Sequence, residues 1–219
     1  REERAKLRDA TLKEKLEYFW YYYKWHTVIA IAAIVLLISL IHDIVTRKDT
    51  VFTVAVINHY ALTAQSEKYR ENLEEYLGID TSKEDTVIDS AYSINFSGYS
   101  RDSINSSEKL MAQAASGSLD AMIADETAFA QYAQNSFFLD LSSVLSEEEL
   151  TSLEAYLYYA ETDEGMVPLG IYLDTCTRFL ETYMPIDEKR SLFGIMANTE
   201  NTERAVLFLH YLLQNNPIE

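Results

Sequence analysis

The sequence predicts an α/β protein, in which one N-terminal transmembrane helix precedes a three-layer α/β domain with a mostly parallel sheet. Three observations support this prediction. An apolar run, TVIAIAAIVLLISLI, extends from Thr27 to Ile41. Beyond residue 50, strand-like and helix-like segments alternate, which is typical of a mostly parallel sheet with helices on both faces. The chain has only six Gly and three Pro, with no linker or repeat, so we expect one compact domain over residues 50–219.

The apolar run predicts a membrane-spanning helix over residues 25–46. Its strictly apolar part falls short of the roughly 20 residues that a span needs, but Ile44-Val45 and an aromatic cluster, residues 18–23 with Trp25, lengthen it. Tyr and Trp concentrate at membrane–water interfaces, so the cluster indicates an interfacial belt. A secretory signal peptide is the rival interpretation, but its small-residue motif at residues 30–32 lies inside the apolar run. We therefore expect an uncleaved anchor.

Charge around the span predicts its orientation. Seven basic residues precede it, and only Arg47 and Lys48 follow it closely. By the positive-inside rule, the N-terminus is cytoplasmic and the large domain is extracellular, held at the cell membrane by a single pass. Apolar residues at helical spacing also predict an amphipathic cytoplasmic or interfacial helix over residues 1–24. A docking helix for a cytoplasmic or intramembrane partner is the alternative for this arm.

The acidity of the chain limits the partners of the external domain. The net charge is −17, and beyond residue 49 there are nine basic and twenty-eight acidic residues, which leaves that part near −19. Nucleic acid and anionic lipid surfaces both require a basic face, so we expect neither as a docking partner. Cys176 is the only cysteine, so the domain has no internal disulfide, and about 170 residues bury enough surface to fold without one.

Five strands and several capped helices are expected in the external domain. The predicted strands are residues 51–57, 86–92, 119–124, 166–172 and 191–196. Because the fourth strand contains Pro and Gly, we expect it at a sheet edge or crossing between elements. Ser146 to Glu149 matches a capping box, which predicts a helix running through Leu153 and Leu157. The other expected helix signals are the N-caps Asn105, Asp125 and Asn201 and the C-terminal stops Gly78 and Gly117.

The predicted sheet also predicts where a ligand would bind. In open α/β sheets, ligands lie beyond the carboxyl ends of the strands. The candidate ligand-binding residues at that edge are Asn58, Tyr60, Tyr92, Asn95, Asp125, Glu126 and Tyr172. A polar, aromatic and acidic rim of this kind suits a small molecule such as a sugar, peptide or amine. The alternative is that these are ordinary polar loops, with Asp125 serving only as a helix cap.

The sequence offers little for catalysis. The four His residues lack metal-ligand spacing, and there is no Gly-rich phosphate loop, nucleophile elbow or paired Cys. Asp120, Asp125 and Glu126 lack the alternating spacing of a calcium loop. We therefore expect no catalytic residue, metal or cofactor, and we interpret Cys176 as a bystander thiol. A Tyr-rich segment, residues 156–159, favours either a protein interface or ordinary packing.

From residue 116 onward, a series of short motifs follows a recognisable order. A small-Gly-x-x-Asp motif precedes a strand, an acidic residue begins the next helix, and a Leu-Asp-Leu turn follows. A Val-Pro-x-Gly strand and a Gly-Ile-x-x-Asn segment then lead to the last helix. These motifs are residues 116–120, Asp125, residues 139–141, 167–170 and 194–198. This order resembles the extracellular solute-binding proteins of ABC importers, which have the type 2 periplasmic-binding fold. The similarity covers residues 51–58 and 116–214.

The chain departs from that family in two respects, the lack of a second lobe and attachment through a membrane-spanning helix rather than a lipid or free secretion. Only about two dozen residues separate Pro168 from Gly194, where the family inserts a second lobe. The resemblance therefore implies a single, membrane-anchored lobe. We expect a non-enzymatic accessory or sensing subunit of a bacterial membrane complex, with a transporter permease as partner. The alternatives are a receptor that delivers a small ligand to an ABC importer and a structural interaction protein unrelated to transport.

Overall fold

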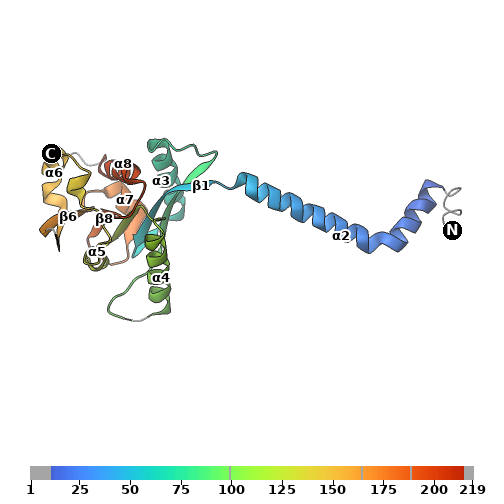
Figure 1. Ribbon diagram of the computed structural model, residues 1–219, viewed down its shortest axis with the longest axis horizontal. Helices are drawn as coiled ribbons and strands as arrows, with labels where there is room; N and C mark the ends of the chain where they lie inside the picture. Colours follow the sequence, from blue (N-terminus) through green and yellow to red (C-terminus); the bar gives the residue numbers. More distant parts are fainter. Residues whose placement is uncertain (1–10, 99, 164, 188, 215–219) are drawn as a thin grey trace. The chain divides into compact units, whose positions relative to one another are not determined.

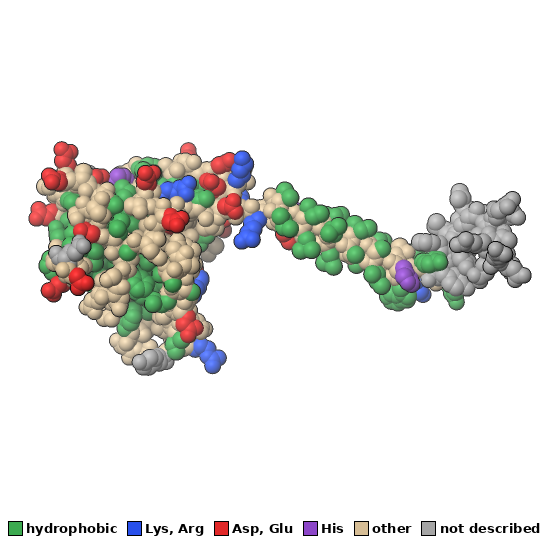
Figure 2. Space-filling model, viewed as in Figure 1, with side chains coloured by type: hydrophobic (Ala, Val, Ile, Leu, Met, Phe, Trp, Pro, Cys, Tyr) green, Lys and Arg blue, Asp and Glu red, His purple; other side chains and the backbone are tan. Residues whose placement is uncertain are grey.

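The computed structural model describes residues 11–98, 100–163, 165–187 and 189–214, and the chain divides into two compact units, Arg1–Arg47 and Lys48–Glu219. The first contains helix α2 (Leu12–Thr46), whose segment Tyr23–Thr46 is long and apolar enough to cross a membrane (Figure 2). Such a helix is compatible with an anchor or a signal sequence. The predicted interfacial arm continues without a break into this helix from Leu12 onward, and its residues 1–10 lie outside the described residues.

The second unit is built on a six-stranded sheet with the order β3-β1-β4-β8-β6-β5. Strand β1 pairs in parallel with β3 and β4, whereas β8 is antiparallel to both β4 and β6, and β5 is antiparallel to β6. Four strands therefore run one way, and β8 and β5 run the other. The α/β class is confirmed, with a mixed sheet that leans towards parallel. The strands are β1 (Asp49–Ile57), β3 (Glu84–Tyr92), β4 (Ala121–Asp125), β5 (Leu157–Thr162), β6 (Gly165–Tyr172) and β8 (Ser191–Ile195).

Helices cover both faces of this sheet, and each face has its own core (Figure 1). Alternate residues of β1 divide between the cores: Val54 and Val56 pack on one side, Ala55 and Ile57 on the other. Helices α3 (Thr63–Tyr76), α6 (Glu147–Leu153), α7 (Thr177–Thr182) and α8 (Thr202–Leu213) cover the first face, and α4 (Arg101–Ala115) and α5 (Glu126–Ala133) the second. This two-period alternation with helices on both sides produces three layers.

Two glycines allow an aromatic pair to lie directly on the sheet. Phe129 and Phe138 stack with ring centroids 4.1 Å apart. A Cβ at Gly170 would lie 2.5 Å from the Phe129 ring, and one at Gly194 would lie 2.7 Å from the Phe138 ring. The interruption that Gly170 makes in the β6 pattern therefore reflects close packing in the sheet interior.

Local capping signals predicted several helix ends correctly. Asp125 accepts hydrogen bonds from the Thr127 and Ala128 amides, and Ser146 forms the expected capping box with Glu149. The prediction for Asn105 was wrong, because α4 begins one turn earlier with Ser100 as its cap. Asn201 occupies the cap position of α8, but its side chain bonds elsewhere and makes no cap hydrogen bond.

The largest error concerns the segment after the capping box. Helix α6 ends at Leu153, a 3-10 turn (Glu154–Tyr156) follows, and residues 157–162 form strand β5. The helix predicted through Leu157 is therefore too long, and β6 lies inside the sheet, because β5 forms the edge beside it. Leu153 and Leu157 are both buried, so four-residue spacing suited either conformation, and pairing with β6 decided between them.

A small second sheet was not predicted. It consists of β2 (His59–Ala61) and β7 (Tyr183–Pro185), which pair in antiparallel fashion. Three-residue strands carry too little periodicity to be recognised from sequence. Of this ribbon, only β7 lies, together with α7, in the stretch between β6 and β8, where the solute-binding family would insert its second lobe.

Candidate functional site

Several strand ends of the domain meet around a polar cavity of about 220 Å³. Parallel strands β1, β3 and β4 finish at one edge of the sheet, and antiparallel β8 begins there. The residues that follow or precede these ends form the walls. The lining residues are Asn58, Ser93, Ile94, Asn95, Phe96, Ser97, Asp125, Thr127, Ala128, Ile186, Asp187 and Lys189. We call this cavity the strand-end pocket.

Asn58 holds three of these segments together. Its Nδ2 donates to the Ile94 carbonyl (2.9 Å) and to Asp125 Oδ2 (2.5 Å), and its Oδ1 accepts from the Ile94 amide (2.8 Å). The residue has φ of 59°, a left-handed conformation that Asn tolerates better than most residues. The ends of β1, β3 and β4 are therefore joined by the side chain of one residue whose backbone is strained.

His59, the next residue, ties β1 to β8. Its Nδ1 lies 2.6 Å from the Ile57 carbonyl and its Nε2 lies 2.8 Å from Ser191 Oγ. A carbonyl can only accept, so Nδ1 carries the proton and Nε2 accepts from the Ser191 hydroxyl. Burial lowers the pKa of His59 below its ordinary value of 6.5, partly offset by the Ile57 hydrogen bond and the Asp125 charge. The imidazole is therefore neutral at pH 7.

Asp125 combines a structural and a cavity-lining position. Oδ1 accepts from the Thr127 (3.0 Å) and Ala128 (3.2 Å) amides at the start of α5, and Oδ2 accepts from Asn58. Lys189 Nζ lies 3.7 Å from Asp125 Oδ1 and also 3.7 Å from Asp187 Oδ2. The Lys189 side chain is 44% exposed, so this cation is free to adjust between carboxylates and a ligand.

The pocket also presents polar groups that no described residue engages. The Ser93 and Thr127 hydroxyls and the Asn95 Nδ2 make no hydrogen bond to another described side chain or backbone group. With Lys189 and Asp187, the cavity therefore offers both donors and acceptors. Phe96 and Ile186 add an apolar part to its wall, and Phe96 is 48% exposed. This mixture suits a small polar molecule with some apolar surface.

Glu126 and Tyr172 form a separate, self-satisfied group. The Tyr172 hydroxyl donates to Glu126 Oε1 (2.7 Å), the Arg190 guanidinium lies 3.5 Å from the Tyr172 ring centroid, and Arg190 Nε bonds Asp174 (2.8 Å). Burial and the Glu126 carboxylate raise the pKa of Tyr172 to about 12. These side chains bind one another, and neither Glu126 nor Tyr172 lines the cavity.

The two remaining candidates also lie outside the pocket. Tyr92 is 2% exposed, and its hydroxyl bonds Gln113, while Lys109 Nζ lies 4.7 Å from its ring centroid. Tyr60 is 59% exposed on β2, opposite Met184 of β7. Of the seven predicted ligand-binding residues, the structure places Asn58, Asn95 and Asp125 together in the cavity.

Sequence reasoning missed Lys189, Asp187 and the apolar wall residues Phe96 and Ile186. Only the ends of the predicted parallel strands were considered. An antiparallel strand starts at the edge where parallel strands finish, so the segment before β8 belongs to the same site. The direction of β8 was the missing information, and the sequence does not encode it locally.

Ser191 and His59 have the hydrogen-bond contact expected of a catalytic nucleophile and its general base. Ser191 is 3% exposed and His59 is 2% exposed, and neither lines the pocket. The third position holds the Ile57 carbonyl and not a carboxylate. A substrate cannot reach this pair, so its contacts serve to join β1 to β8.

Comparisons with known proteins give no information on this site. No protein-family model, curated protein or solved structure matches this chain. Within the described residues, no group of three or more His, Cys, Asp or Glu side chains could hold a metal ion. What the strand-end pocket offers chemically is hydrogen bonding and charge at a preformed cavity, which is the chemistry of binding.

Proposed function

We propose that this chain is a non-enzymatic, membrane-anchored module whose external domain recognises a small polar ligand in the strand-end pocket. It serves as an accessory or sensing subunit of a bacterial membrane complex, with a transporter permease as the expected partner. The single observation that carries the proposal is the convergence of four chain segments on one polar cavity, fixed by the strained Asn58.

The tether supports a sensing role over a delivery role. β1 begins at Asp49, directly after α2 ends at Thr46, and the strand-end pocket lies at the opposite end of β1. Between β6 and β8, the described residues form only α7 and strand β7, so they provide no second lobe to enclose a ligand. A receptor that captures solute by closing two lobes is therefore the weaker candidate.

A ligand screen on residues 48–219 tests the proposal. All core residues lie between Phe52 and Leu212, so this part has its own hydrophobic interior and should fold alone. We expect an amine, amino acid or monosaccharide to raise the free energy of unfolding by about 2.7 kcal/mol at 100 times its Kd. Failure of every such compound to stabilise the domain would contradict ligand recognition.

A second candidate, a structural interaction protein, is favoured by one surface. Tyr60, Leu62, Met184 and Ile186 are all exposed, between 41% and 59%, on or beside the β2–β7 ribbon. Contiguous apolar side chains of this kind are typical of protein interfaces. Mild-detergent purification of the full chain, followed by mass spectrometry, distinguishes the roles: a stoichiometric permease and ATPase support the transporter assignment, and other partners support the alternative.

A further inference from the structure

A second groove of about 250 Å³ lies between α3 and α7, away from the strand-end pocket. Its lining residues are Gln65, Lys68, Tyr69, Asn72, Arg178, Glu181 and Thr182. All of these except Glu181 carry a hydrogen-bond donor in the side chain. Two of the donors are cations, in a domain whose charge is near −19 and whose surface carries many acidic side chains (Figure 2).

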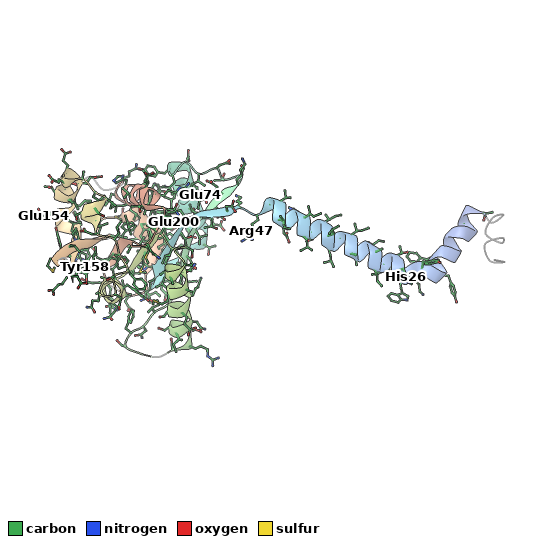
Figure 3. The ribbon with its side chains drawn as sticks, viewed as in Figure 1. His26, Arg47, Glu74, Glu154, Tyr158 and Glu200 are labelled. Carbon is green, nitrogen blue, oxygen red and sulfur yellow. The ribbon has the colours of Figure 1, made fainter. Side chains whose placement is uncertain are left out.

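The sequence of α3 assigns these donors to one side of the helix. Gln65, Lys68, Tyr69 and Asn72 follow the spacing i, i+3, i+4 and i+7, which places them on one stripe. The acidic residues Glu67 and Glu74 fall on the opposite side, whereas Glu71 and Glu75 border the stripe, three residues beyond Lys68 and Asn72. Glu74, labelled in Figure 3, is buried and accepts hydrogen bonds from Arg70 (2.7 Å) and the Thr86 amide (3.0 Å). The donor-bearing stripe of α3 thus contains no acidic residue itself, and Glu71 and Glu75 flank it on one side.

The two cations of the groove have no carboxylate partner among the described residues, a property that they share with Lys83, Arg101 and Arg204. Arg70, Lys109, Lys189 and Arg190 each have a carboxylate within 4.0 Å. In the described part of the chain, neither Lys68 nor Arg178 has one. The positive charges of Lys68 and Arg178 are therefore not neutralised by a neighbouring carboxylate.

Aromatic rings position the guanidinium of Arg178. It lies 5.6 Å from the ring centroid of Tyr211, which in turn packs against Tyr69 at 5.4 Å. Contact with a ring face holds the guanidinium while leaving its N–H groups available. Burial raises the pKa of Tyr69 well above its ordinary value of 10, so this phenol stays protonated and can donate. The buried hydroxyl of Tyr211, behind the groove, has no hydrogen-bond partner among the described residues.

We propose that the α3–α7 groove binds a phosphate group, with Arg178 and Lys68 as its principal ligands. Gln65, Asn72 and Tyr69 supply additional donors from the same helix. A phosphate has three or more oxygens and a charge of about −1.5 to −2, so it can engage more of this donor set than a carboxylate can. Arg presents a planar fork that matches phosphate, and Lys adds a compact charge.

Glu181 opposes an anion and therefore provides a sensitive test. Its carboxylate lies on the same wall as Arg178, one helical turn away on α7. If an anion binds here, removing this charge should tighten binding. If the groove is only a solvated surface, Glu181→Gln should have no effect on phosphate.

The experiment is a titration of residues 48–219 with inorganic phosphate, followed in ¹H–¹⁵N NMR spectra at constant ionic strength with chloride as the exchanged anion. We expect saturable shifts at α3 and α7. Arg178→Gln should weaken phosphate binding about tenfold or more. Lys68→Gln should weaken binding less, and Glu181→Gln should strengthen it. Arg101→Gln is the matched control, because Arg101 is also exposed and has no carboxylate within 4.0 Å among the described residues.

Vesicles of phosphatidylglycerol, compared with phosphatidylcholine, identify the source of the phosphate. If the domain binds the anionic vesicles and Arg178→Gln abolishes that binding, the site is supported with a lipid headgroup as its ligand. Phosphate binding without vesicle binding supports it with a soluble phosphate compound. The proposal is overturned if phosphate produces no saturable shifts, or if Arg101→Gln weakens binding as much as Arg178→Gln and Lys68→Gln do. Should Arg178→Gln fail to fold, Lys68→Gln and Glu181→Gln still decide between these results.

Discussion

The two ends of β4 carry two buried aspartates with different surroundings. Asp120, before the strand, is 3% exposed and accepts from the Thr53 amide (2.8 Å), Thr199 Oγ1 (2.5 Å) and Asn201 Nδ2 (3.0 Å). Asp125, at the other end, is 4% exposed, but it borders the strand-end pocket and faces the adjustable Lys189. Asp120 is surrounded by groups of the folded chain, whereas Asp125 also faces the strand-end pocket.

This difference separates a carboxylate whose partners all lie in the fold from one that also borders a cavity. Asp120 joins β1, β4 and the turn before α8, so it fixes the sheet internally. Asp125 fixes the helix start and leaves a cation partly free. Equal burial therefore does not imply equal roles, and the completeness of the hydrogen-bond shell decides between them.

The largest expected effect is that of Asp120→Ala. Three donors inside the fold would lose their acceptor, at about 1 kcal/mol or more each, so we expect a loss of about 3 kcal/mol or more in the free energy of unfolding. Urea unfolding of residues 48–219, followed by circular dichroism, measures it. A loss below about 1 kcal/mol would remove the structural role that the comparison assigns to Asp120.

Asp125→Ala should cost less, about 1 to 2 kcal/mol. The α5 cap is lost, but Asn58 keeps its bonds to Ile94 and Lys189 is already exposed to water. Asp125→Ser is the matched variant, because Ser is also a good N-cap, and it should recover about 1 kcal/mol in the same urea experiment. A loss equal to that of Asp120→Ala would show that the two ends of β4 do not differ as described.

Asn58 should reveal the strain at the pocket end. Asn58→Gly and Asn58→Ala both remove the side-chain bonds, but only Gly adopts φ of 59° without steric cost. We therefore expect the Ala variant to be less stable than the Gly variant by about 1 kcal/mol in thermal unfolding. Equal stability of the two variants would mean that this backbone conformation carries no strain.

His59 gives the smallest effect, as a dependence on pH. Its pKa is lowered in the fold, so below its ordinary value of 6.5 the unfolded chain binds more protons than the folded chain does. Stability should therefore decrease as pH falls through 6.5, with a slope of at most about 1.4 kcal/mol per pH unit from this residue. His59→Gln should remove that part of the slope between about pH 7.5 and pH 5.5. An unchanged slope would contradict the neutral, buried imidazole.

The sequence predicted features that depend on neighbouring residues. Asp125 as a cap and the capping box at Ser146 require only three or four residues to interact, and both were correct. The prediction of Asn105 failed because Ser100, which was not considered, also matches a cap pattern and starts α4 earlier. Strand β5 failed because its partner β6 comes later in the chain and overrides a helical spacing.

The pocket was predicted only as far as parallel strands define it. Asn58, Asn95 and Asp125 follow from the rule that such strands end at one edge, and they line the same cavity. Lys189 could not be inferred, because its position depends on β8 running antiparallel to β4. Tyr92 was misplaced because a residue at a strand end can point into the core, which the sequence pattern did not resolve.

The account depends most on the strand-end pocket, and one measurement tests it directly. We would titrate ¹⁵N-labelled residues 48–219 with the most stabilising amine, amino acid or monosaccharide, and repeat the titration on Lys189→Ala and the distant control Lys83→Ala. The account predicts saturable shifts at Asn58, Asn95 and Thr127, with binding weakened about tenfold by the first variant and unchanged by the second. Shifts confined to other surfaces, or equal binding by both variants, would contradict it.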